Sequence, residues 1–203
     1  MKTETVVSGL AGVLIGVVLT LVLAPAWGGM MGSRNFMMGG NRMTAGIDAV
    51  FIEQMIPHHE DAIVMADLAL VKAEHDEIKE LATDIKRTQS EEIEQMQAWY
   101  KDWFGKDVPD AFAGTSHGMG SDTMHMGMMG DATDSHDLET AADFDKAFIE
   151  DMIPHHQMAV MMAQMLQATT DRPEMEQLAK NIINAQTLEI NAMREWYRQW
   201  YGE

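Results

Sequence analysis

Apolar residues recur every three to four positions along four stretches of this chain, which is the spacing of a helix that packs one face against a core. In the first stretch, residues 47–73, this face consists of Phe51, Ile52, Met55, Ala62, Ile63, Ala66 and Leu70. In the second, residues 76–104, it consists of Ile78, Ala82, Ile85, Ile93, Met96 and Tyr100. Helices are also predicted over residues 142–168 and 173–201, so the sequence predicts an all-α fold.

Two local signals refine these helices. Asp171 stands before Arg172-Pro173-Glu174 and is expected to be the N-cap of the last helix, with proline in the first turn. Pro57 and Pro154 lie inside helical patterns. Because the apolar face continues in phase across each proline, a kink is favoured over a break in which proline would open a new helix.

The second half of the chain repeats the first. Phe51–His59 reads FIEQMIPHH, and 97 residues later Phe148–His156 reads FIEDMIPHH. The same offset aligns Leu81 with Leu178, Ile85 with Ile182, Gln89 with Gln186, Glu92 with Glu189, Met96 with Met193, Trp99 with Trp196 and Trp103 with Trp200. So long a match without a gap indicates a duplication. Two repeated αα-hairpins joined by a long crossover predict a ferritin-like four-helix bundle.

The segments outside the hairpins complete the predicted organisation. Residues 6–24 form an uncharged apolar run that ends in Ala24-Pro25-Ala26, an A-x-A-like cleavage pattern. We therefore expect export to the periplasm or the extracellular space, with a signal peptide or a membrane anchor at residues 1–27. The remaining parts are a Met/Gly-rich segment at 28–45, the hairpins at 46–105 and 142–203, and a Met/His-rich linker at 106–141.

Composition restricts the chemistry of the chain. It has no cysteine, 21 methionines and a formal net charge of -18. The absence of cysteine excludes disulfides, thiolate metal sites and a nucleophilic thiol. The acidic balance argues against nucleic acid, because phosphate binding needs a cationic face. Methionine in place of cysteine suits an oxidising compartment, where thiols are lost to disulfides.

The consecutive histidines of the two repeats are expected to have different roles. Neighbours on a helix point about 100° apart, so His58 and His59 cannot face the same place. His59 and His156 fall on the apolar face, opposite Gln and Glu of the following helix, and are expected mainly to form a buried polar network. That network could also orient a metal-bound ring. His58 and His155 fall on the flank and are the better candidate ligands.

Methionines outnumber what a core needs in two places. On the predicted helix over 142–168, His155, Met158, Met161, Met162 and Met165 cover a strip beside the core face. Thioether sulfur is a soft ligand suited to Cu(I) and Ag(I), and imidazole accepts copper in both oxidation states. Packing also cannot explain the linker residues, so a ligand role is predicted for His117, Met119, Met124, His125, Met126, Met128 and Met129. The alternative for the linker is low-complexity drift in a spacer.

The repeated F-I-x-x-M-I-P-H-H, the following A-x-x-M-A and the Q-x-x-E-I-x-x-M-x-x-W of the second helix resemble the DUF305 family. The likeness covers about residues 47–105 and 144–202. It implies a ferritin-like bundle that binds copper and silver through methionine and histidine, in copper resistance. The ligands implied in this chain are Met55, His58, His59, Met65, Met96, Met152, His155, His156, Met162 and Met193. Asp61 stands where the second repeat has Met158, so the two sites need not be equal.

The sequence therefore favours an exported copper-binding protein over two alternatives. The expected cargo is Cu(I), and Cu(II) and Ag(I) are further candidates. The expected partners are copper efflux or chaperone proteins. The chain would also contact the membrane if its leader is retained. A ferritin-like metal oxidase would need two E-x-x-H motifs, and the chain has none; we expect no enzymatic activity. A structural envelope protein would leave the methionine-rich tracts unexplained.

Overall fold

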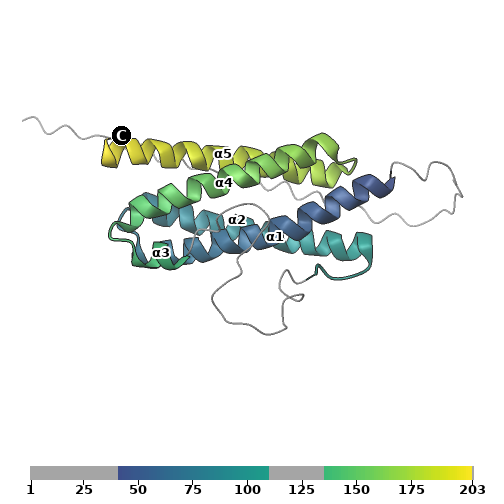
Figure 1. Ribbon diagram of the computed structural model, residues 1–203, viewed down its shortest axis with the longest axis horizontal. Helices are drawn as coiled ribbons and strands as arrows, with labels where there is room; N and C mark the ends of the chain where they lie inside the picture. The colour runs from purple at the N-terminus through teal and green to yellow at the C-terminus, as the bar shows by residue number, and fades with distance from the viewer. Residues whose placement is uncertain (1–40, 110–134, 203) are drawn as a thin grey trace, which may run out of the picture. The chain divides into compact units, whose positions relative to one another are not determined.

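The computed structural model describes residues 41–109 and 135–202, which form five helices (Figure 1). Helices α1 (Asn41–Lys72) and α2 (Asp76–Phe104) make the first hairpin. Helices α4 (Phe144–Thr169) and α5 (Pro173–Tyr201) make the second, and the short α3 (Ser135–Thr140) precedes it. The predicted all-α fold of two αα-hairpins is confirmed. The crossover falls largely on residues 110–134, outside the described residues.

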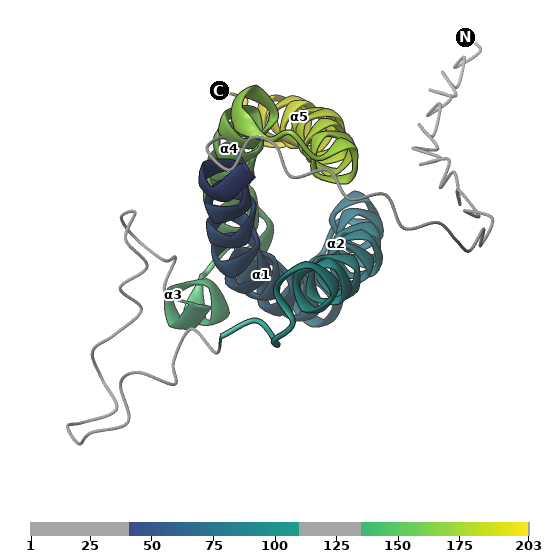
Figure 2. The same cartoon turned by 90° about the vertical axis from the view of Figure 1, so that its right-hand side faces the viewer.

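The two hairpins meet chiefly through their first helices. Figure 2 looks along the helices and shows α1 and α4 side by side, with α2 next to α1 and α5 next to α4. Figure 1 shows that α1 and α4 run in opposite directions. This antiparallel seam brings the N-terminal half of each of these helices against the C-terminal half of the other.

The core consists of two buried clusters, and each takes side chains from both hairpins. One cluster joins Ile78 and Ile85 of α2 to Phe148 of α4 and includes Leu138 of α3. The other joins Ile52 of α1 to the C-terminal half of α4 and the first half of α5. The hairpins therefore share their apolar cores and are not two independent units. Between the clusters, at the middle of α1 and α4, lie the paired histidines of the two repeats.

The helix ends differ from the sequence expectation at two points. Helix α1 begins at Asn41, six residues before the expected start, where no apolar periodicity marks a helix. The N-cap of α5 is Arg172 without a side-chain cap bond, so the prediction of Asp171 was wrong. The reason is that Thr170 holds this turn: its hydroxyl accepts from the Arg172 N–H at 3.1 Å. Pro173 at N1 lacks the N–H that an aspartate cap could have satisfied.

Both helices that contain an internal proline are continuous. Pro57 lies inside α1 and Pro154 inside α4, and neither helix is interrupted there. The alternative of a break at proline was therefore wrong, and the kink stays a prediction. The uninterrupted helices place the histidine pairs that follow each proline in the interior of the seam.

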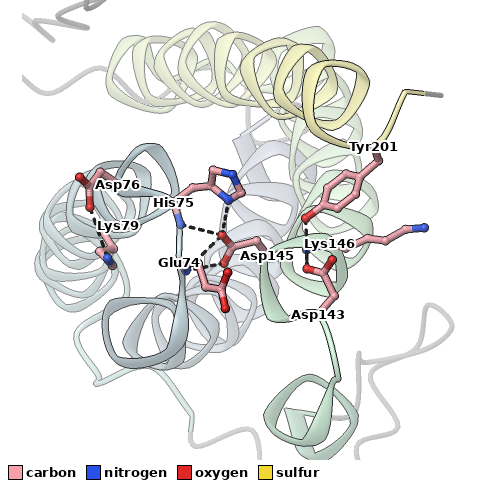
Figure 3. A network of polar contacts seen from close by, with 8 residues as sticks. All are labelled: Glu74, His75, Asp76, Lys79, Asp143, Asp145, Lys146 and Tyr201. Carbon is pink, nitrogen blue, oxygen red and sulfur yellow. Dashed lines mark hydrogen bonds and ion pairs between the residues drawn. The ribbon is translucent and has the colours of Figure 1, made fainter.

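Each hairpin holds the loop of the other through a buried aspartate, and the two contacts are copies. Asp145 of α4 accepts from the backbone N–H groups of Glu74 (3.1 Å) and His75 (2.8 Å) and from Nδ1 of His75 at 2.6 Å (Figure 3). The His75 ring in turn stacks on Trp200, with ring centroids 3.7 Å apart. Figure 3 shows the loop between α1 and α2 directed onto the start of α4.

The second copy of this contact lies at the other end of the seam. Asp48 of α1 accepts from the Thr170 hydroxyl at 2.8 Å and pairs with Nε of Arg172 at 3.0 Å. The Arg172 guanidinium lies 4.1 Å from the centroid of the Trp103 ring. The repeat relates the two contacts residue by residue: Asp48 corresponds to Asp145, Arg172 to His75 and Trp103 to Trp200. The duplication therefore supplies one hairpin-to-hairpin contact at each end of the seam.

We expect Asp145→Ala to lower the free energy of unfolding by about 2 kcal/mol, because it removes the buried acceptor of two backbone N–H groups and of the half-buried His75 ring. Urea denaturation followed by circular dichroism measures the loss. Asp102→Ala, at an exposed position of α2, is the matched control and should cost less than about 0.5 kcal/mol. Equal losses in the two variants would contradict the role of Asp145 in joining the hairpins.

Within residues 41–109 and 135–202, none of the helices has the length and apolar character needed to cross a membrane. The predicted leader or anchor at residues 6–24 lies outside the described residues.

Candidate metal centre

His58 and His155 face each other at the middle of the α1–α4 seam. Their ring centroids are 3.8 Å apart, and the ring planes are tilted by 42°. The two residues are copies of one position, and the two helices are antiparallel. A residue close to the pseudo-twofold axis of such a pair meets its own copy. The sequence placed each of these histidines on a helix flank but did not bring them together.

His59 and His156 are fully buried and point into the hairpins instead. His59 Nε2 lies 2.8 Å from Oε2 of Glu92, and His156 Nε2 lies 2.7 Å from Oε2 of Glu189. In each pair the ring N–H donates to the carboxylate. The predicted His–Glu contact between the helices of each hairpin is confirmed. When Nε2 carries the proton, the lone pair of the neutral ring is on Nδ1.

The four histidines form one layer across the molecule, which we call the central layer (His58, His59, His155 and His156). The ring centroids of His58 and His59 are 6.4 Å apart, and those of His155 and His156 are 6.2 Å apart. Each hairpin thus contributes one ring to the seam and one ring to its own interior. The carboxylates of Glu92 and Glu189 flank the layer.

Hydrogen-bonding groups in and beside this layer are left without partners. Buried atoms without a hydrogen bond are Nδ1 of His58, His59 and His156, both ring nitrogens of His155, and Oε1 of Gln89 and Gln186. In the described ranges the one other such atom belongs to Asp48, which has its ion pair with Arg172. The Gln side of the predicted network is therefore not formed. A buried polar group left unpaired costs about 1–3 kcal/mol, so a cluster of them indicates a ligand site.

The two seam histidines are held in their neutral form. Burial lowers the pKa of His58 from 6.5 to about 3, with smaller contributions from the charges of His59 and His156. A hydrogen bond to the backbone of His155 opposes this shift. Burial, followed by the neighbouring histidines, also holds the pKa of His155 well below its usual value. Protons therefore do not compete for these ring nitrogens near neutral pH.

Buried methionine thioethers lie one helical turn from the fully buried histidines or from the glutamates that these histidines contact. Met55 precedes His59 by one turn of α1, and Met96 follows Glu92 by one turn of α2, in the same buried cluster. Met152 and Met193 repeat this arrangement in the other cluster. All four are fully buried, and Met65 is nearly so. Four of the sequence-predicted methionines, Met55, Met96, Met152 and Met193, are thus on the core side, within a turn of His59 and His156 or of their carboxylate partners.

The remaining predicted ligands lie away from the layer or outside the described residues. Met158 and Met162 of α4 are half-buried, whereas Met165 is 62% exposed. The predicted linker ligands, from His117 to Met129, fall in residues 110–134, outside the described residues. In the ranges that are described, no three histidine, aspartate or glutamate side chains come together as a metal cage. The donors gathered at the centre are imidazole nitrogens, with thioether sulfurs within a turn.

Comparison with known proteins shows the family to which this chain belongs. A family model described as a domain of unknown function, DUF305, matches residues 48–197, which is most of the chain. The chain belongs to the DUF305 family. The match spans both hairpins together with the segment between them.

Solved structures of DUF305 relatives have the same fold. The chain is 47% identical to CopM in the Cu(I)-bound form, with a TM-score of 0.65, and the match covers 76% of this chain and 97% of that one. For CopM in the Cu(II)-bound form the values are 51%, 0.66, 76% and 97%. A DUF305 fragment from Deinococcus radiodurans is 29% identical, with a TM-score of 0.61, and covers 75% of this chain and 96% of that one.

A curated relative is matched over a shorter region. The uncharacterized protein L153 of Acanthamoeba polyphaga mimivirus is 45% identical over 49 residues, or 24% of this chain. The match spans about a third, 32%, of that protein.

Proposed function

We propose that this DUF305 chain binds Cu(I), and Ag(I) as its chemical analogue, at the central layer. The observation that carries the proposal is the meeting of His58 and His155 across the seam, where both rings are neutral and half-buried and where Nδ1 of His58 and both ring nitrogens of His155 lack a hydrogen-bond partner. His59 and His156 add Nδ1 atoms whose rings are oriented by carboxylates. A carboxylate on the second ring nitrogen is the usual device for orienting a metal-bound histidine.

The donor set supports a soft ion over a hard one. Imidazole suits copper, and thioether sulfur selects Cu(I) over cations such as Mg²⁺ and Mn²⁺, which prefer oxygen ligands. Met55 and Met152 offer buried sulfur one turn from His59 and His156, and Met96 and Met193 offer it one turn from the glutamate partners of these rings. The carboxylates nearest the histidines are already bonded to the ring N–H groups, so they serve the rings as orienting partners.

The relatives support the same ion. CopM, 47–51% identical to this chain, has been solved with Cu(I), with Cu(II) and with silver bound. The match covers 97% of that chain and 76% of this one. The position of the Met-Ile-Pro-His-His motif at the centre of the fold fits a binding site shared within the family.

The proposed role is copper sequestration, trafficking or resistance outside the cytoplasm. The apolar run at residues 6–24 with its A-x-A-like end supports export. The lack of cysteine and the abundance of methionine support soft-metal binding in an oxidising compartment. Binding and release of the ion require no catalytic group, and we propose no enzymatic activity.

A parallel titration of the full chain tests this proposal. The chain is titrated with Cu(I) against a chromophoric Cu(I) chelator, and with Fe(II) under air while oxygen consumption is followed. The expected result is competition with the chelator for Cu(I), with no Fe(II) binding and no oxygen uptake. Iron binding with turnover would replace the proposal by a metal oxidase. Failure to bind either ion would favour a structural envelope protein.

A further inference from the structure

Four methionines of α4 form a strip along the outer margin of the seam. They are Met158, Met161, Met162 and Met165, which we call the α4 strip. Positions i, i+3, i+4 and i+7 lie on one face of a helix. Met165 is 62% exposed and Met161 41%, while Met158 and Met162 are half-buried. Apolar side chains gathered at a surface need an explanation other than core packing.

The first repeat shows what packing alone requires at these positions. The corresponding residues of α1 are Asp61, Val64, Met65 and Leu68. Asp61 is exposed, Val64 is 51% exposed, and the same helix folds with one methionine there. The other three methionines of the strip are therefore additions that the shared fold does not need.

The surroundings of the two copies also differ. In the first repeat, Met65 lies in the buried cluster that includes Leu138 of α3, and the partly buried Leu68 packs against this cluster. Helix α3 contacts both α1 and α4 on that half of the seam (Figure 2). In the second repeat, the corresponding Met162 is half-buried and Met165 is exposed in the described structure. The difference concerns two positions of the strip: Met162 and Met165 are more accessible than their covered copies Met65 and Leu68.

The strip leads toward the central layer. Met158 lies one turn, and Met162 two turns, after His155 on the same side of α4. Exposure falls along this path, from Met165 and Met161 at the surface to half-buried Met158, Met162 and His155. Adjacent positions of such a strip bring side chains within contact of each other. Pairs of thioether sulfurs can therefore share one ion and pass it along the helix.

We propose that the α4 strip is a surface site for a soft monovalent cation, and the entry point from which the ion reaches His155. This inference rests on the proposed function of the central layer. The ion keeps its charge throughout: a ring nitrogen of His155 replaces a thioether sulfur in a ligand exchange, and no electron or proton is transferred. Neutral sulfur ligands select Cu(I) and Ag(I) from the hard cations that an acidic surface attracts.

Residue-resolved NMR on the full chain tests the strip. The methionine methyl groups are labelled with ¹³C, the histidine rings with ¹⁵N, and Ag(I) is added because it does not change oxidation state. Methyl signals of the α4 strip should shift at the lowest Ag(I) ratios, before or together with the ring signals of His155. Met175, fully buried in α5 and not among the proposed ligands, is the internal control and should not move.

A variant separates sulfur chemistry from apolar packing. Met158→Leu with Met161→Leu and Met165→Leu keeps the apolar surface but removes three sulfurs. We expect fewer bound Ag(I) ions and slower appearance of the shifted His155 ring signals, with unfolding unchanged. Val64→Leu, at the corresponding exposed position of α1, is the matched control and should leave both quantities as they are.

The outcomes distinguish the two proposals. Shifted ring signals without any shift of the strip methyls would overturn the strip and leave the central layer intact. Unshifted rings and unshifted strip methyls would overturn both. If the leucine variant binds Ag(I) with wild-type stoichiometry and rate, the strip is an apolar docking surface and not a metal site.

Discussion

Replacing His58 and His155 together by alanine is expected to remove tight Cu(I) binding from the central layer. The two rings contribute nitrogens from opposite sides of the seam, and no other described histidine faces them there except His59 and His156. Loss of a partner that only orients a ligand typically lowers metal affinity by roughly 10- to 100-fold. Loss of two ligands should therefore lower it by more than about 100-fold.

Competition with a Cu(I) chelator measures this loss, with far-UV circular dichroism to establish that the helices are retained. Glu92→Gln should lower the Cu(I) affinity by only roughly 10- to 100-fold, as expected for a partner that orients a ligand. The glutamine amide still contacts the His59 ring but no longer carries the charge. His75→Ala removes a histidine at the end of the hairpin and should leave the affinity unchanged. Wild-type affinity in the His58→Ala, His155→Ala double variant would show that copper is bound elsewhere.

Acid is expected to destabilise the metal-free fold through the same two histidines. In the unfolded chain each ring takes up a proton as the pH falls through 6.5, whereas in the folded chain the pKa of His58 is about 3 and that of His155 is also low. The unfolded state then binds more protons, so stability rises with pH in this window. The contribution of neutral His58 is complete above pH 6.5 and is lost progressively toward pH 3. Between pH 7 and pH 5 the loss from His58 is about 2 kcal/mol.

Urea unfolding of the metal-free chain at a series of pH values measures this effect. The informative quantity is the difference between the wild type and His58→Gln, because titration of the many carboxylates is common to both. Glutamine cannot take up the proton, so the variant should lose less stability on acidification. Parallel pH profiles for the two chains would contradict a depressed pKa for His58. Added Ag(I) should restore wild-type stability at low pH, since it binds the neutral rings.

The parts of the fold that depend on local pattern were predictable from the sequence. Helices α2 and α5 have the predicted bounds, because apolar periodicity, Pro173 at the first turn and an aromatic C-terminus all mark them. The start of α1 was missed because residues 41–46 show no apolar face. The cap at Asp171 was wrong because a contact from Asp48, distant in the sequence, holds the turn through Thr170.

The candidate site was predictable in its residues but not in its arrangement. The His59–Glu92 contact follows from the faces of two neighbouring helices, which the sequence pattern gives directly. The meeting of His58 with His155 depends on which faces the two hairpins turn toward each other, and one helix pattern cannot supply that. The duplication was the available signal, since symmetric copies meet at their own twofold axis. The sequence pattern showed the methionine strip, but only the structure shows that Met161 and Met165 are exposed and lie outside the core.

The most direct test of copper binding at the central layer is the anomalous scattering of a crystal of this chain grown with Ag(I). We expect a strong anomalous peak within bonding distance of ring nitrogens of His58 and His155, where the two repeats meet. Peaks confined to other parts of the molecule, with the two rings still in direct contact, would contradict it.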